Sequence, residues 1–294
     1  MQSLVGESER QLLQPMPSSD GLVIVDPPLS GEQNMAIDEA LLRNVKPDWP
    51  VVLRIYRWDR PTLSLGHFQR IEDRSQHPLL SKLPWVRRRT GGGAIVHDQE
   101  LTYSVLLPNR VGYPSKGHSD ALYRDLHLSF VEKLTSLGWD AGLSETCTCP
   151  TSEHGNPQPF LCFSRRSPVD LIVNGDKILG SAQRRSAAGL LQHGSFLLRR
   201  SQWTPELCGL LDTAKKPASE DNLRENRLVD ALNETGQSRN QLSSIEVDLW
   251  IGLLKSMILS GLSKSVWINW QSGSIADLMP EKNDGTWIPG FNGD

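Results

Sequence analysis

The run of twelve residues from Arg87 to Asp98, RRRTGGGAIVHD, constrains this chain more than any other feature of its sequence. Its three adjacent glycines, Gly91, Gly92 and Gly93, lack Cβ atoms, so a bound group can lie directly against their backbone N–H donors. Such donors suit an anion, a carbonyl or a developing oxyanion. The run predicts either a ligand-binding glycine loop or a glycine-rich hairpin turn with basic flanks.

Length and composition indicate a globular protein built on one large domain, with or without a small appendage. The 294 residues are 38% hydrophobic and 22% charged. No apolar run reaches the ~18–20 residues needed to span a bilayer, and residues 1–20 contain no apolar segment of the kind found in secretion signals. Four cysteines are too few for a disulfide scaffold. We therefore expect a cytoplasmic protein with free thiols and no membrane association.

The charge is unevenly distributed along the chain. A net charge of −3 argues against a general nucleic-acid binder. Residues 86–200 carry a net charge of +4, whereas the rest of the chain carries −7. A basic middle in an acidic chain favours an acidic ligand or partner, although a solvated basic face would give the same pattern.

Hydrophobic patterning divides the chain into strands and helices. Apolar and β-branched runs predict strands over residues 21–26, 51–56, 62–65, 94–96, 101–107, 169–173, 177–183 and 190–198. Helices are expected after the cap Ser30 and over 118–137, 205–211, 222–232 and 244–259. The four strands between 51 and 107 are expected to share one mixed or antiparallel sheet. Asn174-Gly175 predicts a tight hairpin.

The same patterning predicts three parts. Residues 1–19, rich in Gln, Ser and Pro, are expected to form a flexible tail, and residues 20–260 a single domain. Residues 261–294 are expected to be a weakly structured C-terminal extension, because glycine and proline recur through them.

Cys162 and Lys177 are candidates for acyl-transfer chemistry. Cys162 lies in the apolar segment 159–163, where a free cysteine is usually a small buried hydrophobe. Its alternative role is that of a nucleophile, for which the thiolate is the competent form. Lys177 lies on a predicted strand with the small residues Gly180, Ser181 and Ala182. A lysine after an Asn-Gly turn is most often solvated, but beside Cys162 it would increase the thiolate fraction.

The other cysteines and His193 have simpler explanations. Cys147, Cys149 and His154 could join Cys162 around zinc, but the C-x-C-x4-H-x7-C spacing lacks C-x2-C pairs, so we expect no metal. Cys208 has leucine neighbours and is expected to pack in a core. His193, before a glycine, either lines a pocket or bonds to a neighbouring strand.

Four ordered segments together resemble the biotin/lipoate-protein ligase catalytic superfamily, in its lipoate-ligase and octanoyltransferase branch. They are Asn34–Glu39 (NMAIDE), Pro61–Gly66 followed by Gln69, Arg88–Asp98, and Lys177–Arg184 followed by His193-Gly194. The third matches the family pattern R-R-x-S-G-G-G-A-V-x-H-D, with Thr90 in place of the serine, and the fourth matches K-[IV]-x-G-S-A-x-R.

The resemblance implies an α+β fold whose mixed, largely antiparallel sheet is flanked by helices and cradles a linear acyl chain. It implies an acyltransferase domain with two walls around the chain. One wall would consist of Arg88, Thr90, Gly91, Gly92, Gly93 and His97. The other would consist of Lys177, Gly180, Ser181, Ala182 and His193.

The branch decides the chemistry that the resemblance implies. Octanoyltransferases of the subfamily most similar to the ligases use a cysteine at the position of Cys162, which would carry an octanoyl or lipoyl thioester without a cofactor. The alternative is a lipoate ligase that uses ATP and magnesium to form an adenylate, but Ser167–Val169 replaces the Gly-Arg-Asn of the ligases. Another transferase subfamily has its cysteine where Cys208 lies. A non-catalytic acyl-binding homologue is the third class.

The resemblance also implies protein partners. The donor would be an acyl carrier protein, and the acceptor a lipoyl domain or the glycine cleavage H protein. From charge alone, we expect the basic pairs Arg165-Arg166, Arg184-Arg185 and Arg199-Arg200 to dock these acidic proteins.

Overall fold

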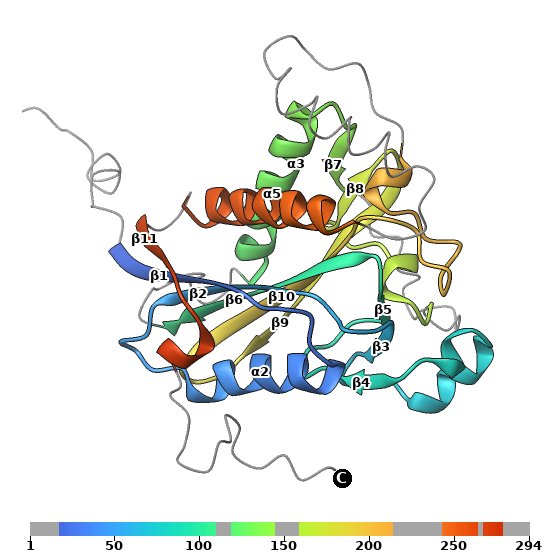
Figure 1. The fold of residues 1–294 in the computed structure, drawn as a ribbon, viewed down its shortest axis with the longest axis horizontal. Coiled ribbons are helices and arrows are strands. Elements are labelled where there is room, and N and C mark those ends of the chain that lie inside the picture. The colour runs from blue at the N-terminus through green and yellow to red at the C-terminus, as the bar shows by residue number, and fades with distance from the viewer. Residues whose placement is uncertain (1–17, 110–118, 145–158, 214–242, 264–266, 279–294) are drawn as a thin grey trace, which may run out of the picture.

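The computed structural model describes residues 18–109, 119–144, 159–213, 243–263 and 267–278, which form an α+β fold (Figure 1). Eight strands make the main sheet in the order β11-β1-β2-β6-β10-β9-β8-β7. Their bounds are β1 Ser18–Val25, β2 Val51–Tyr56, β6 Glu100–Pro108, β7 Ala141–Leu143, β8 Leu171–Val173, β9 Asp176–Arg185, β10 Gly189–Leu197 and β11 Trp267–Ser272. The pairings of β1 with β2 and β11 are parallel, and the other five are antiparallel.

Helices cover both faces of this sheet (Figure 1). α2 (Gly31–Asn44) lies on one face, where Leu41 and Leu42 pack with Val52, Leu106 and other buried strand residues. α3 (Ser119–Ser136) and α5 (Ser244–Ser263) lie together on the opposite face, over the larger hydrophobic core. Side chains alternate across a strand, so the two faces of each central strand supply the two cores.

A second sheet of three strands carries the glycine run. β3 (Thr62–Leu65) lies between β4 (Trp85–Arg87) and β5 (Ile95–His97). The glycines therefore occupy the connection between the two outer strands. Short 3₁₀ helices complete the described chain at Ile71–Gln76, Leu80–Lys82, Cys162–Ser164, Leu210–Asp212 and Ile275–Asp277.

Most of the predicted elements are confirmed. The hairpin turn at Asn174 and Gly175 has φ values of 49° and 89°, the left-handed pair that a tight turn between twisted strands requires. Ser30 caps α2 through a reciprocal capping box with Gln33, which satisfies N–H groups that the helix cannot bond internally. The helices predicted over 118–137 and 244–259 correspond to α3 and α5.

One predicted sheet assignment and one predicted helix were wrong. The strands over 62–65 and 94–96 do not join the main sheet with 51–56 and 101–107 but belong to the small one. Residues 205–211 form turns and the start of a 3₁₀ helix rather than an α-helix, and Gly209 packs there against the backbone of Leu198 and Arg199, where a Cβ would not fit. Residues 222–232 and residues 1–17 of the predicted tail lie outside the described residues, whereas Ser18 and Ser19 belong to β1.

The C-terminal segment contains more regular structure than its composition indicated. Residues 261–263 complete α5, and β11 adds a parallel edge strand beside β1 in which Ile268 is buried. The strand lacks clear alternation of polar and apolar residues, so the sequence pattern did not mark it. The division into tail, domain and extension stays a prediction.

Trp250 is expected to be the main contact that fixes α5 to the sheet, because its ring lies 6.0 Å from that of Trp139 and 6.1 Å from that of Phe196. Trp250→Ala should lower the free energy of unfolding by about 3–5 kcal/mol, measured by urea denaturation. Ile245→Ala, on the same helix but exposed, should change it by less than about 0.5 kcal/mol. Equal effects of the two substitutions would contradict this packing.

Candidate active site

Cys162 and Lys177 meet in the folded protein. Cys162 begins the 3₁₀ helix before β8, and Lys177 is the second residue of β9. The Lys177 Nζ lies 3.8 Å from the Cys162 Sγ, 3.3 Å from the Cys162 carbonyl oxygen and 3.4 Å from that of Arg165. The thiol and the amine that the sequence analysis singled out therefore share one site.

The position of Lys177 is fixed by a buried ion pair. Its Nζ lies 2.8 Å from a carboxylate oxygen of Asp170, and both side chains are less than a tenth exposed. The Asp170 carboxylate also accepts a hydrogen bond of 2.7 Å from the backbone N–H of Ser167. A buried charge is tolerated only when it is paired and hydrogen-bonded. Gly180 leaves the space that the lysine occupies, since a Cβ there would lie 2.8 Å from the Lys177 Cε.

The glycine run holds the cysteine segment in place. The Cys162 N–H donates to the Ala94 carbonyl at 2.8 Å, and the Ala94 N–H donates to that of Phe160 at 2.9 Å. A Cβ on Gly93 would lie 2.7 Å from the Cys162 nitrogen, so only glycine allows this close approach. Gly92 has a φ of 95°, which L side chains rarely adopt, while a Cβ on Gly91 would meet nothing within 4 Å. Packing therefore requires glycine at position 93 and backbone conformation favours it at position 92, whereas no contact requires it at position 91.

Arg88 stabilises the loop from inside. Its guanidinium donates to the carbonyl and the hydroxyl of Ser64 and to the carbonyls of Gly91 and Gly93, at 2.7–3.2 Å. Burial lowers the pKa of Arg88 to about 10, although the nearby Cys162 acts in the opposite direction. The Nε of Arg88 is buried and has no hydrogen-bond partner in the described part of the chain. One N–H donor of this buried side chain thus remains unpaired.

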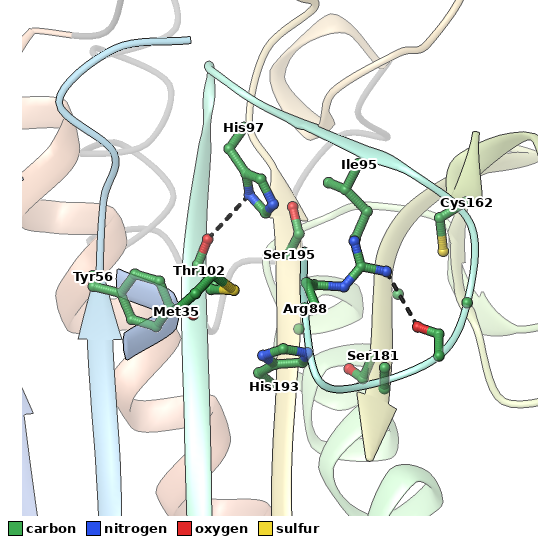
Figure 2. A pocket seen from close by; sticks show the side chains of 15 residues that line it. Met35, Tyr56, Arg88, Ile95, His97, Thr102, Cys162, Ser181, His193 and Ser195 are labelled. Atoms are coloured by element: carbon green, nitrogen blue, oxygen red, sulfur yellow. Dashed lines mark hydrogen bonds between the residues drawn. The ribbon is translucent and has the colours of Figure 1, made fainter. Parts of the chain in front are cut away.

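A cavity runs from Cys162 across the sheet toward α2, and we name it the acyl cavity (Figure 2). In Figure 2, Cys162 and Ser181 lie at one end and Met35 and Tyr56 at the other. The residues that line the acyl cavity are Met35, Tyr56, Arg88, Gly91, Gly92, Ile95, His97, Thr102, Cys162, Gly180, Ser181, Ala182, His193, Gly194 and Ser195.

His97 belongs to a buried network around Glu100. Its two ring nitrogens lie 3.0 Å from Glu100 and 2.7 Å from the Ser64 hydroxyl, and Trp58 stacks on the ring at 3.8 Å. Thr102 and Ser195 also donate to the Glu100 carboxylate. Burial lowers the pKa of His97, and the carboxylate of Glu100 only partly opposes this. The ring is thus held at a fixed orientation beside the cavity.

His193 belongs to a second buried network. Its ring nitrogens lie 3.2 Å from Asp38 and 2.6 Å from the Thr90 hydroxyl. Asp38 also accepts hydrogen bonds from Arg54 and Tyr56. Burial would raise the pKa of Asp38, but the His193 hydrogen bond and the Arg54 charge outweigh it and hold the pKa below its usual value. His193 thus lines the pocket, the first of its two predicted alternatives.

His127 of α3 was missed by the sequence analysis. One ring nitrogen lies 2.8 Å from the Ser181 hydroxyl and the other contacts the Val169 carbonyl. The Ser181 hydroxyl also bonds to that of Tyr103 at 2.7 Å. Burial lowers the pKa of His127 to about 4, against the hydrogen bond to Val169. No sequence signal separates this histidine from a packed residue on an amphipathic helix.

The predicted walls are largely, but not wholly, assembled. Arg88, Gly91, Gly92 and His97 line one side, and Gly180, Ser181, Ala182 and His193 line the other. Thr90 instead faces a neighbouring cavity, and Gly93 packs against the Cys162 backbone rather than toward a ligand. Lys177 reaches the site behind Gly180 without lining the cavity.

Several other predictions concern residues away from the cavity. Arg199 pairs with Glu246 at 2.9 Å and is largely buried, so it is unsuited to docking a partner. The Cys208 Sγ contacts Arg200 at 3.0 Å and is only partly buried, so it is not the packed core residue that was expected. Cys147, Cys149 and His154 lie outside the described residues. No helix in the described ranges is long and apolar enough to cross a membrane.

Known proteins with similar sequences and folds agree with the resemblance. Residues 30–252 match the family model of the lipoyl protein ligase A/B catalytic domain. The chain is 39% identical to the octanoyltransferase LipM of Kyrpidia tusciae over 56% of this chain and 61% of that protein. It is 33% identical to the octanoyltransferase LipM of Brevibacillus brevis over 77% of this chain and 80% of that protein.

A solved structure shows the same fold. The bi-partite lipoate protein ligase from Thermoplasma acidophilum, analysed with its E2 lipoyl domain, has a TM-score of 0.54 and 21% identity over 88% of both chains. The fold thus defines a lipoate-ligase-like catalytic domain. Because the family model covers most of the chain, the chain belongs to the lipoyl protein ligase A/B catalytic-domain family. It spans about three fifths of the length of the first curated relatives it matches.

We expect His127 to make the protein less stable in acid. The pKa of His127 is about 4 in the folded protein, against 6.5 for an unperturbed histidine, so between these values the unfolded chain binds a proton that the folded protein excludes. Stability should therefore fall as the pH decreases through this window, by up to about 1.4 kcal/mol per pH unit from this group. The free energy of unfolding in urea, measured between about pH 7 and pH 4, tests this.

His127→Gln should flatten this pH dependence by about one proton while retaining a polar group near Ser181. A residual slope should remain, because burial also lowers the pKa of His97. If the free energy of unfolding changed with pH in the same way in the wild type and the variant, His127 would have the same pKa in the folded and unfolded protein.

Proposed function

We propose that this protein transfers an octanoyl group, or a lipoyl group, from an acyl carrier protein to the lysine of a lipoyl domain through a thioester on Cys162. The observation that carries this proposal is the Cys162 Sγ at one end of the acyl cavity, 3.8 Å from an ammonium group fixed by Asp170. An adenylating ligase needs no such thiol. The curated relatives, named octanoyltransferases, support the same reaction.

In the first half-reaction, the sulfur of Cys162 attacks the carbonyl carbon of the donor thioester. A new carbon–sulfur bond forms while negative charge develops on the carbonyl oxygen. The donor carbon–sulfur bond then breaks, and the carrier leaves as a thiol after taking up the proton that Cys162 gave up. Lys177, whose Nζ lies 3.8 Å from the sulfur, stabilises negative charge on it. Arg88 lines the same cavity with one unpaired N–H donor, which makes it a candidate for stabilising the charge on the oxygen.

In the second half-reaction, the lysine amine of the acceptor attacks the Cys162 thioester. The amide bond forms, the carbon–sulfur bond breaks, and the amine proton returns to the sulfur, which restores the thiol. The balance requires no oxidant, nucleotide or metal ion. A lipoyl domain is the acceptor class that fits, because such a domain accompanies the T. acidophilum ligase of the same fold.

Cys162→Ala should abolish acyl-enzyme formation. Incubation of the wild type with octanoyl-carrier protein should add about 126 Da, the mass of one octanoyl group on a nucleophile, detected by intact-protein mass spectrometry. The variant should stay unmodified and transfer nothing to a lipoyl domain. AMP formation that requires lipoate and ATP, with no adduct, would identify a ligase instead.

Cys208→Ala is the matched control for this experiment. Cys208 is a free, partly buried cysteine like Cys162, but its sulfur contacts Arg200 and does not line the acyl cavity. The control should acquire the adduct at the wild-type rate. If Cys208→Ala lost the adduct and Cys162→Ala retained it, the nucleophile would be Cys208 rather than Cys162. The absence of both adduct and AMP would favour a non-catalytic acyl-binding protein.

Docking of the acidic carrier is expected to depend on salt. Arg184 and Arg185 are exposed at the end of β9, so their attraction to an acidic partner is screened over about 10 Å at 0.1 M salt. The kcat/KM for octanoyl-carrier protein should fall several-fold between about 50 and 300 mM salt, whereas that for a small neutral octanoyl thioester should not change.

The double variant Arg184→Ser/Arg185→Ser should show a weaker salt dependence than the wild type. Arg70→Ser, which removes an exposed arginine of the small-sheet region, should behave like the wild type. If the kcat/KM for octanoyl-carrier protein did not depend on salt, Arg184 and Arg185 would not be part of the docking surface.

A further inference from the structure

Two cavities of this protein share part of one wall. Met35 and His193 line the acyl cavity and also a second cavity, named here the distal cavity. The distal cavity has much the larger volume, about 460 Å³ against about 40 Å³ for the acyl cavity. The shared wall therefore separates a narrow slot from an open space beyond it.

The shared wall has a fixed part and an adjustable part. His193 is held by hydrogen bonds at both ring nitrogens, to Asp38 and to Thr90. Met35 precedes Asp38 by three residues on α2, so both side chains lie on the same face of the helix. A methionine side chain has no branch, three rotatable bonds and no strong hydrogen-bonding group. Met35 is thus the adjustable side chain among the two residues that the cavities share.

Met35 lies at the end of the acyl cavity far from the chemistry (Figure 2). The lining runs from Gly180 on β9 to Ser195 on β10, Thr102 on β6 and Tyr56 on β2, each directly paired with the next. Neighbouring strands are about 4.8 Å apart, so three intervals span about 14 Å. A linear chain attached to Cys162 would therefore extend across the sheet toward the end of the cavity that Tyr56 and Met35 line.

The distal cavity has a surface on which an alkyl chain could continue. Leu42 of α2 and Leu191 of β10 line it with Ala187 and Ala188. Its other lining residues include the arginines Arg43, Arg89, Arg184 and Arg185. The distal cavity thus offers apolar surface to an alkyl chain beside the charged side chains, which also include Asp38 and Glu39.

We propose that Met35 closes the acyl cavity at its far end and thereby sets the longest acyl chain that Cys162 accepts. This inference rests on the proposed function. A shorter side chain at position 35 opens the slot into the distal cavity, whereas a larger one shortens the slot.

Acylation of Cys162 by carrier-protein thioesters of six, eight, ten, twelve and fourteen carbons tests the proposal, with rates read by intact-protein mass spectrometry. Met35→Ala should raise the rate ratio of the twelve- to the eight-carbon donor at least tenfold. Met35→Trp should shift the preference toward six carbons, which keeps the proposal testable if the smaller variant does not fold. Met35→Leu, which conserves volume, should keep the wild-type profile.

Leu191→Ala is the control for enlargement of the distal cavity alone, because Leu191 does not line the acyl cavity. It should leave the length profile unchanged. An octanoyl adduct with the same profile in the wild type, Met35→Ala and Met35→Trp would overturn the role of Met35 and leave the proposed function intact.

A second readout does not depend on acylation. The rise in Tm caused by free octanoic and dodecanoic acids should be larger for octanoic acid in the wild type and larger for dodecanoic acid in Met35→Ala. If the wild type forms no octanoyl adduct, the proposed function fails, and these shifts still decide the role of Met35. Equal shifts in both proteins would overturn it.

Discussion

The close approach of two backbone segments at Gly93 is the constraint on which the site depends. The cysteine segment hydrogen-bonds to Ala94 through Phe160 and Cys162, on the two sides of Leu161, only because residue 93 has no Cβ. Gly180 has a similar role on β9, where the absence of a Cβ leaves room for the side chain of Lys177. The thiol and the ammonium therefore meet because Gly93 and Gly180, which are 87 positions apart in the chain, both lack a Cβ atom. The space left at Gly93 holds the Cys162 backbone, and the space left at Gly180 holds the Lys177 side chain. A side chain at either position would separate the pair before it altered the rest of the fold.

Buried charges keep this site open rather than collapsed. Arg54, Asp38, Glu100 and Arg88 are all buried around an otherwise apolar cavity, and each has several hydrogen-bond partners. Because removing one partner would leave an unpaired buried charge, such networks resist rearrangement. Apolar side chains alone would gain energy by closing over an empty slot. The polar networks thus hold the walls of the narrow slot at a fixed separation.

The sequence allowed the residues that meet at the site to be predicted better than the shape of the cavity. The Asn174-Gly175 turn, the cap at Ser30 and the pairing of Cys162 with Lys177 depend on short-range rules or on motifs, and all are found in the structure. His127 could not be predicted, because its role depends on α3 crossing β9 at Ser181. Thr90 and Gly93 were assigned to the wrong surfaces for a similar reason: the orientation of a loop residue depends on the segment that packs against it.

The acyl cavity brings together residues from distant parts of the chain. The reactive groups come from the segments that flank β8, whereas Met35 comes from α2, which packs over β6 and β10. The hydrogen bonds of Cys162 and Lys177 do not involve Met35. The proposed limit on chain length and the proposed transfer chemistry therefore depend on residues of different elements, one on a helix face and the others in a loop and on a strand.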